Sequence, residues 1–273
     1  MRETGSMPAR VLTIAGSDSG GGAGIQADLK TITVLGGFGM SVITALTAQN
    51  TMGVHGIFDT PPEFVAAQFD AVMSDIGADA AKTGMLARQD ILEVVIEKIQ
   101  AYGLEKLVVD PVMVAKGGTH LVREDILAYL KAALIPLAFV ITPNIPEAEV
   151  LTGMTIKTRT DMKEAARRIF DMGSRCVIVK GGHLEGAALD VFFDGNNIHE
   201  FTRQRIETPN THGTGCTFSA ALATGIAQGK PLLEAVAQAK DYITEAIRYA
   251  FPLGAGHGPT NHLAPIVKEG GPC

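Results

Sequence analysis

Two glycines flank one threonine in the segment Thr208-Pro209-Asn210-Thr211-His212-Gly213-Thr214-Gly215-Cys216-Thr217-Phe218-Ser219. A run of small residues follows, from Ala220 to Ala227, and indicates a helix whose first turn is 213–216. The first N–H groups of a helix lack intrahelical partners, and glycines let an anion approach them closely. We therefore expect an anion cradle here, in which Cys216 would have a lowered thiol pKa. The alternative is a glycine-rich turn with a buried cysteine, and the segment alone does not decide between the two.

Composition limits the class of protein. The chain has 273 residues, of which 46% are hydrophobic, and a net charge of −6. This balance suits a globular domain with a sizeable core and argues against a nucleic-acid partner. The three cysteines form neither a metal-ligand spacing nor a disulfide framework, so we expect a cytoplasmic protein. No apolar run is long enough to span a membrane, so no membrane partner is expected.

Short apolar runs alternate with helical patterns along the chain. Strands are predicted at 10–15, 39–49, 78–83, 106–110, 138–142 and 175–180, followed by a hairpin of 188–193 and 198–201. Helices are predicted at 25–35, 62–76, 89–102, 123–134, 146–151, 161–172, 213–228 and 231–249. This order is typical of an α/β/α sandwich, with a mostly parallel sheet covered on both faces.

One domain, from 9 to 266, is the expected organisation, because no linker or repeat interrupts the pattern. Residues 1–8 are interpreted as a disordered leader or a cloning remnant, and 267–273 as a frayed tail. In parallel sheets ligands bind outside the carboxyl ends of the strands, so the loops that start there should carry the function.

Two motifs favour other nucleotide folds only weakly. The segment 22–27 fits the dinucleotide pattern G-x-G-x-x-A, but no acidic residue follows the second strand, where that fold needs one. The segment 225–230 resembles a P-loop, but its spacing is one residue short and it ends a helix. A helix C-terminal turn explains the second segment better.

Polar residues at four predicted strand and helix ends suit a nucleoside triphosphate and its metal. Asn144 and Glu147 share one helix face, and their oxygens suit Mg²⁺, although a helix cap would also explain them. Asp110 could join the metal shell, and Lys180 offers a point charge to a phosphate. With the 213–216 cradle, these residues provide what phosphoryl transfer needs: positioning, charge stabilisation and a base.

These motifs together resemble the ribokinase-like superfamily, in which sugar kinases usually carry aspartate where this chain has Cys216. The segments Ala-Gly-Ser-Asp-Ser-Gly-Gly-Gly-Ala-Gly-Ile-Gln-Ala-Asp (15–28) and Thr-Ala-Gln-Asn-Thr (47–51) resemble the hydroxymethylpyrimidine/phosphomethylpyrimidine kinases of thiamine biosynthesis. The resemblance extends from Arg10 to about Pro265. One departure is Ser19, where the family often has proline.

The resemblance implies a role for each matching residue. Cys216 would be the catalytic base, and Gly213, Thr214, Gly215 and Cys216 would form the oxyanion cradle. Gln49 would read the aminopyrimidine edge, with Asp28, Gly16, Met85 and Val112 lining the same pocket. Lys180, Asn144 and, with less support, Lys240 would meet ATP or its phosphates, and Glu147, Asn144 and Asp110 would hold Mg²⁺.

Structural roles stay open for several of these residues. Asp28 could only favour its helix start, Met85 could belong to the core, and Lys240 could lie on a solvated helix face. The implied substrates are ATP, an aminopyrimidine alcohol and its monophosphate, and the implied assembly is a homodimer. A pyridoxal or pyridoxine kinase is the rival enzyme. A non-catalytic nucleotide-binding regulator is the rival from another class.

Overall fold

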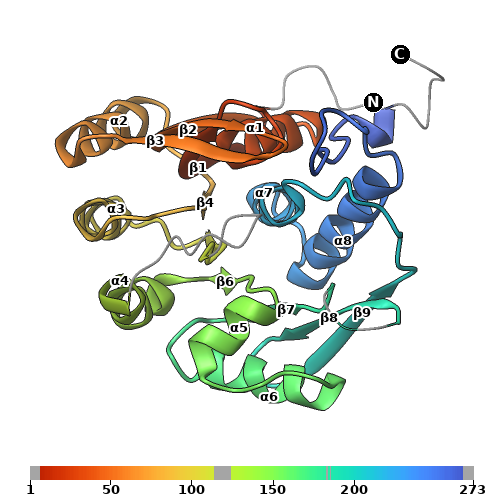
Figure 1. Cartoon of the computed structure of the whole chain (residues 1–273). Coiled ribbons are helices and arrows are strands. Elements are labelled where there is room, and N and C mark those ends of the chain that lie inside the picture. The colour runs from red at the N-terminus through yellow and green to blue at the C-terminus, as the bar shows by residue number, and fades with distance from the viewer. Residues whose placement is uncertain (1–6, 114–123, 183, 185, 267–273) are drawn as a thin grey trace.

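One sheet of nine strands runs through the part of the chain that the computed structural model describes, residues 7–113, 124–182, 184 and 186–266 (Figure 1). Its spatial order is β3-β2-β1-β4-β5-β6-β7-β8-β9. The strands are β1 Arg10–Asp18, β2 Phe38–Asn50, β3 Gly53–Asp59, β4 Ala80–Thr83, β5 Leu107–Val109, β6 Val140–Ile141, β7 Val177–Lys180, β8 Ala188–Phe193 and β9 Ile198–Arg203.

The six strands from β2 to β7 in this order are parallel to their neighbours, whereas β3, β8 and β9 are antiparallel. The central strands are almost completely buried, for example β4 and β5 along their whole length. Strands covered on both faces favour apolar side chains, as in β5, and the buried Lys82 of β4 is paired with Asp28. The predicted α/β/α sandwich is confirmed.

Helices cover both faces of the sheet (Figure 1). The helices on the larger core are α2 Pro62–Asp75, α3 Gln89–Ala101, α4 Glu124–Tyr129, α5 Ile145–Thr152 and α6 Arg159–Phe170. The helices on the opposite core are α1 Gly24–Val34, α7 Thr214–Ala227 and α8 Leu232–Arg248. Helix α7 is buried at ten consecutive positions, because its alanines, serine and glycine let the neighbouring helices approach closely.

Three local features differ from the sequence prediction. Strand β1 continues to Asp18 instead of ending at Ala15, since a β-bulge lets Ser17 and Asp18 pair with β2. Strand β3 was not predicted, and it pairs antiparallel with β2 at the exposed edge. The helix predicted over 123–134 is α only to Tyr129. A π-helical turn (Leu130–Leu134) and a 3₁₀ turn (Ile135–Leu137) follow, and Pro136 lacks the N–H that the ladder would need.

Several sequence predictions fall at the margins of the structure. Residues 1–6 of the expected leader, residues 267–273 of the expected tail and residue 123 of the predicted helix lie outside the described residues. The domain limits 9 and 266 stay a prediction. Among the described helices, none is both long and apolar enough to cross a membrane.

The parallel strands all end at the same edge of the sheet. Asp18, Asn50, Asp110 and Lys180 lie at or next to the carboxyl ends of β1, β2, β5 and β7. The first turn of α7 contacts this edge, and an isolated parallel bridge between Asn144 and Lys180 extends the pairing of β6 and β7 to it. The fold therefore gathers the predicted functional loops in one place.

Candidate active site

A cavity of about 610 Å³ opens at the carboxyl edge of the sheet. It collects almost all the residues that the sequence singled out. Those lining it are Gly16, Gln49, Met85, Asp110, Val112, Asn144, Glu147, Lys180, Gly213, Thr214, Gly215, Cys216 and Lys240. Asp28 is the predicted site residue that does not line it.

The cavity wall includes the amino end of α7. Gly213 has a φ of +81° and lies so close to the Gly22 carbonyl oxygen that a Cβ would overlap it, so only glycine fits there. No side chain of the described residues caps this helix. Its amino end therefore presents a positive dipole end toward the cavity, as the predicted anion cradle requires.

A charged pair lies directly beside the cradle. A Cβ built on Gly215 would be 3.4 Å from Lys180 Nζ and 3.5 Å from Asp110 Oδ2, in ordinary contact with both. Lys180 Nζ donates to Asp110 Oδ1 at 3.1 Å. Burial lowers the pKa of Lys180, but the carboxylates of Asp110 and Glu147 raise it by more, so the lysine stays charged. The cradle thus has a cation at its side.

Asn144 and Glu147 form a capping box at the start of α5. Asn144 Oδ1 accepts from the Glu147 N–H at 2.9 Å, and Glu147 Oε2 accepts from the Asn144 N–H at 2.8 Å. The cap that we considered as an alternative role is therefore present, and both residues also line the cavity. Burial raises the pKa of the Glu147 carboxyl to about 7, and the neighbouring Asp110 carboxylate adds to this rise.

The described residues contain no cluster of three or more histidine, cysteine, aspartate or glutamate side chains that would hold a metal by itself. Magnesium bound to a triphosphate needs fewer protein ligands, because phosphate oxygens and water complete its octahedron. The Asp110 carboxylate helps to raise the pKa of Glu147, and a divalent cation would relieve that repulsion. The donor set therefore fits a phosphate-bound Mg²⁺.

The expected low thiol pKa of Cys216 is wrong for this structure. Cys216 is partly exposed to the cavity, but its surroundings are poorly solvated, and burial raises the pKa of its thiol to about 11. The Lys82 ammonium and the Gly24 N–H lower it by less. Loss of solvation is the dominant effect, and the thiol is protonated near neutral pH.

Part of the cavity lining is apolar. Met85 and Val112 belong to it, and Met85 Cε is 2.9 Å from where a Cβ on Gly16 would lie, so Gly16 keeps room for the methionine. Val54 and Ile57 of the unpredicted strand β3 add further apolar surface. The arrangement suits a flat ring that presents a polar edge to Gln49.

Asp28 does not line the cavity, contrary to the prediction. Its side chain is 0% exposed, and it accepts from Lys82 Nζ at 2.9 and 3.1 Å and from Thr13 Oγ1 at 2.6 Å. Burial lowers the pKa of Lys82, but Asp28 and the other negative groups nearby together raise it by more, so the ammonium stays charged. Asp28 therefore balances a buried charge beneath the site instead of lining the cavity.

Lys240 does not lie on a solvated helix face. It is 6% exposed, and its Nζ donates to Asp190 Oδ2 at 2.7 Å. Asp190 Oδ1 also accepts from the Gly181 N–H at 3.0 Å. Through Asp190, Lys240 thus connects α8 to the loop after β7. Lys240 lines the cavity, but its charge is paired with the Asp190 carboxylate.

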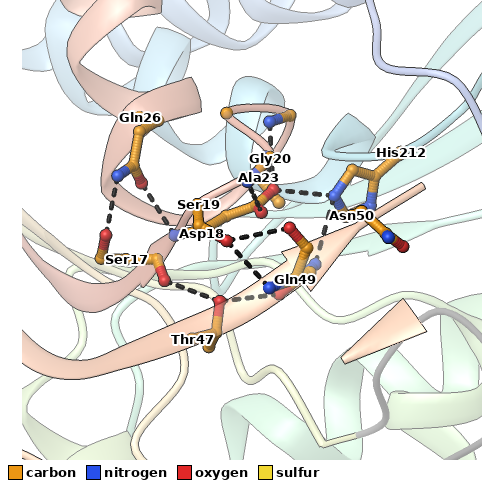
Figure 2. Close-up of polar contacts among 12 residues, drawn as sticks. Ser17, Asp18, Ser19, Gly20, Ala23, Gln26, Thr47, Gln49, Asn50 and His212 are labelled. Atoms are coloured by element: carbon orange, nitrogen blue, oxygen red, sulfur yellow. Dashed lines mark hydrogen bonds and ion pairs between the residues drawn. The ribbon is translucent and has the colours of Figure 1, made fainter. Parts of the chain in front are cut away.

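Three further side chains at the site had no predicted role. Asp18 accepts from His212 Nε2 at 2.9 Å, and His212 lies 3.3 Å from Gln49 Nε2 (Figure 2). Arg205 donates to the carbonyl oxygens of Gly182, Leu184 and Gly186, and so holds the loop after β7. His212 directly precedes the Gly-Thr-Gly-Cys motif, which was a signal for its presence at the site. Arg205 gave no comparable signal.

Fold and site together define a ribokinase-like kinase of small molecules. A family profile described as phosphomethylpyrimidine kinase matches residues 18–261. The hydroxymethylpyrimidine/phosphomethylpyrimidine kinase of Bacillus subtilis strain 168 is 51% identical over 257 residues, which cover 93% of this chain and 95% of that protein. The chain therefore belongs to the phosphomethylpyrimidine kinase family.

Two other similarities bear on function. The thiamine biosynthesis bifunctional protein ThiED of Geobacter sulfurreducens is 59% identical over 254 residues. The aligned region covers 93% of this chain but only 52% of the length of that relative. The solved ADP complex of a pyridoxal kinase from Bacillus subtilis has a TM-score of 0.90 and 42% identity, and covers 95% of this chain and 99% of its own.

Proposed function

We propose that this chain uses ATP to phosphorylate 4-amino-5-hydroxymethyl-2-methylpyrimidine and then its monophosphate, in thiamine diphosphate biosynthesis. The observation that carries the proposal is one cavity with two kinds of lining. Apolar side chains and the Gln49 amide suit a ring. The 213–216 cradle, with Lys180 and two carboxylates, suits phosphates. A ring with a hydroxymethyl arm fits between an amide and an anion site.

Gln49 would read the pyrimidine. Its amide carries both a donor and an acceptor, and so does the edge of an aminopyrimidine. Met85, Val112 and Gly16 would provide the ring-shaped space beside it. In this arrangement the hydroxymethyl arm points toward Cys216.

The transfer itself needs positioning more than strong bases. The hydroxymethyl oxygen attacks the terminal phosphorus of ATP, the bond from that phosphorus to the ADP oxygen breaks, and the alcohol proton passes to Cys216 Sγ. The transition state is loose, so the proton leaves late. The N–H groups of the cradle and the Lys180 ammonium stabilise the charge on the transferred group. Because the thiol pKa is about 11, only its small ionised fraction can accept the proton.

Asp110, Glu147 and Asn144 would hold Mg²⁺ together with the phosphates. Bound Mg²⁺ would neutralise phosphate charge and orient the terminal phosphoryl group. Lys180 would contact phosphate directly. Lys240 would act on phosphate only by sharing its contact with Asp190.

A cytoplasmic homodimer is the setting we propose. Both cysteines in the described residues are free thiols, which suits a reducing compartment. The edge strand β3 and its neighbour β2 expose large apolar side chains, among them Leu46, Ile57 and Phe58, which are 47%, 49% and 67% exposed. A second copy of the chain would cover them. Light scattering should then give about twice the chain mass of 28.7 kDa.

Product analysis tests the proposed function. Incubating the protein with the aminopyrimidine alcohol and excess Mg-ATP should give the monophosphate first and then the diphosphate. The likeness to a pyridoxal kinase makes pyridoxal the competing substrate. A product that stops at the monophosphate, together with efficient use of pyridoxal, would favour the rival kinase. Failure to phosphorylate either ring would favour a nucleotide-binding regulator.

A further inference from the structure

A chain of polar contacts surrounds the Gln49 side chain (Figure 2). On one side, His212 Nε2 lies 2.9 Å from Asp18 Oδ2 and 3.3 Å from Gln49 Nε2. On the other side, Thr47 Oγ1 lies 3.2 Å from Gln49 Oε1 and 2.9 Å from the Ser17 carbonyl oxygen. The amide thus has a fixed neighbour at each end. What each neighbour donates or accepts decides which way the amide points.

Asp18 determines the proton position on His212. The carboxyl is 3% exposed, and burial by itself raises its pKa. Hydrogen bonds from His212 and from the N–H groups of Ala23 and Gly20 lower it by more, so the group is a carboxylate. A carboxylate only accepts, and a bare Nε2 at 2.9 Å would set two acceptors against each other. His212 Nε2 therefore carries a proton and donates to Asp18.

Thr47 fixes the other end of the amide. Its hydroxyl has a single proton, which is donated to the Ser17 carbonyl oxygen at 2.9 Å. Toward Gln49 the hydroxyl oxygen is then an acceptor. It is best satisfied by an NH₂ group.

These two constraints agree. With the amide nitrogen toward His212, two donors would face each other at 3.3 Å. With the amide oxygen there, the oxygen is a second, weaker acceptor of the single Nε2 proton that His212 donates mainly to Asp18, and the amide nitrogen donates to Thr47. Oxygen and nitrogen of an amide are assigned by their hydrogen-bond partners, so the second orientation is the one the network selects.

From this network we infer that Asp18 and His212 are positioning residues that set the Gln49 amide in one orientation and thereby select the substrate ring. The inference rests on the proposed function for the identity of that ring. In this orientation the free lone pair of Oε1 accepts from an exocyclic amino group. The free proton of Nε2 donates to the adjacent ring nitrogen. If an oxo group replaced the amino group, its oxygen would lie against Gln49 Oε1. Both atoms are hydrogen-bond acceptors, so they would repel each other.

Two backbone hydrogen bonds fix the position of His212. The His212 N–H donates to the Gly258 carbonyl oxygen at 3.0 Å, and its own carbonyl oxygen accepts from the Thr260 N–H at 3.2 Å. Asp18 is fixed as well, since it accepts from the N–H groups of Gly20, Gly22 and Ala23. Both partners are thus in place before substrate binds, as a specificity device requires.

The first test measures the proton on His212 directly. Nitrogen-15 NMR of the unliganded protein near pH 8, with His212→Gln used to assign the signal, should show a proton on Nε2. A bare Nε2 with a proton on Nδ1 would overturn the inference. This measurement needs no substrate, so it stands even if the proposed function fails.

The second test measures ring selection. The aminopyrimidine alcohol and its oxo counterpart are compared in the parent, in His212→Ala and in Asp18→Asn. The preference for the amino ring, as a ratio of kcat/KM, should fall about tenfold or more in His212→Ala, because a freed amide can turn to suit either ring. It should fall less in Asp18→Asn, and the KM for ATP should stay unchanged in both.

His257→Ala is the matched control, because His257 contacts the same loop at the Pro209 carbonyl oxygen but not Gln49. It should keep the parent preference. Gln49→Ala should abolish the preference altogether. If His212→Ala slows both rings by the same factor and leaves the ratio unchanged, His212 only supports the fold and the inference is wrong.

Discussion

Cys216 shows how two local effects compete at the scale of one residue. The Lys82 ammonium and the Gly24 N–H favour a thiolate, whereas burial favours the thiol. Burial has the larger effect, and the pKa of about 11 lies above the ordinary thiol value of 9.0. The helix-end rule that predicted a reactive cysteine is valid where the thiol is also solvated, and this thiol is not.

Thiol labelling tests this balance. In a Cys273→Ser background, which removes the cysteine outside the described residues, Cys216 should react before Cys176. Cys176 is 7% exposed, and burial raises its pKa to about 11 as well, so access separates the two. Near pH 7 we expect Cys216 to react about a hundredfold more slowly than an ordinary thiol, and its rate should rise about tenfold per pH unit.

The reaction is followed with a chromogenic disulfide reagent and located by peptide mass analysis. Rapid labelling of Cys216 at pH 7 would contradict the raised pKa. Labelling of Cys176 first would show that the site is closed to the reagent.

Single residues also mark the limit of sequence interpretation. Cys216, Gln49 and the Asn144/Glu147 pair follow from motifs, because each lies next to a strand end or a glycine turn. Asp28 belongs to a motif too, but its partner Lys82 is 54 positions away in a fully buried strand, and no local pattern shows that ion pair. Contacts between distant segments set such side-chain roles, and only the folded chain reveals them.

At the scale of elements, α5 serves two purposes with the same side chains. Its capping box fixes the start of the helix, and its carboxylate and amide face the cavity. Taken alone, the sequence motif Asn-x-x-Glu favours a cap over a metal ligand, and the structure shows the cap with both side chains lining the cavity. A variant that keeps the cap and removes the charge can separate these two roles.

Glu147→Gln is that variant. The glutamine oxygen can still accept from the Asn144 N–H, so α5 should keep its start and the free energy of unfolding at pH 8 should not fall. The Mg²⁺ concentration for half-maximal activity should rise about tenfold, because a charged ligand is lost. Activity is titrated with Mg²⁺ after chelation. Identical titration curves for variant and parent would remove Glu147 from the metal site.

The segment after α8 is a second element whose role appears only in the fold. It brings His262 to the first turn of α7, where Thr217 Oγ1 lies 3.0 Å from His262 Nε2. Tyr242 donates to the His262 carbonyl oxygen at 2.7 Å. Burial and, to a smaller degree, the Lys30 charge lower the pKa of His262 from 6.5 to about 4.

This histidine should make the protein sensitive to acid. The unfolded chain binds a proton at His262 below about pH 6.5 and the folded chain only below about pH 4, so this stability is complete above pH 6.5 and is lost as the pH falls to 4. A shift of that size corresponds to at most about 3 kcal/mol. Urea unfolding of His262→Gln between pH 4 and 7 should show a shallower pH slope than the parent. Equal slopes would mean that another group carries the acid sensitivity.

At the scale of the whole molecule, the order of the chain predicts where the site lies. Apolar strands alternating with helices imply a parallel sheet, and a parallel sheet collects its loops at one edge. The sequence could not reveal the edge strand β3, since 53–59 is largely exposed and has no apolar pattern, yet Val54 and Ile57 line the cavity. The hydrophobic periodicity of the sequence predicts the sheet topology. The outer wall of the site cannot be predicted in this way, because it depends on packing at an exposed edge of the sheet.

The described residues hold one cradle in one cavity at that edge, so both proposed phosphorylations should use the same residues with different demands. The first acceptor is an alcohol, which must lose a proton. The second is a phosphate oxygen, which is already ionised near neutral pH. Cys216→Ala should therefore slow the first step by about 10² or more and the second step much less. Lys180→Met should slow both, because each step brings two anions together.

Single-turnover assays started separately from the alcohol and from its monophosphate, with Mg-ATP in excess, measure the two steps. The first step in the parent should also quicken toward alkaline pH as the thiol ionises, and this dependence should vanish in Cys216→Ala. Cys176→Ala is the control and should leave both rates unchanged. Equal losses in the two steps would mean that Cys216 shapes the cradle and takes no proton.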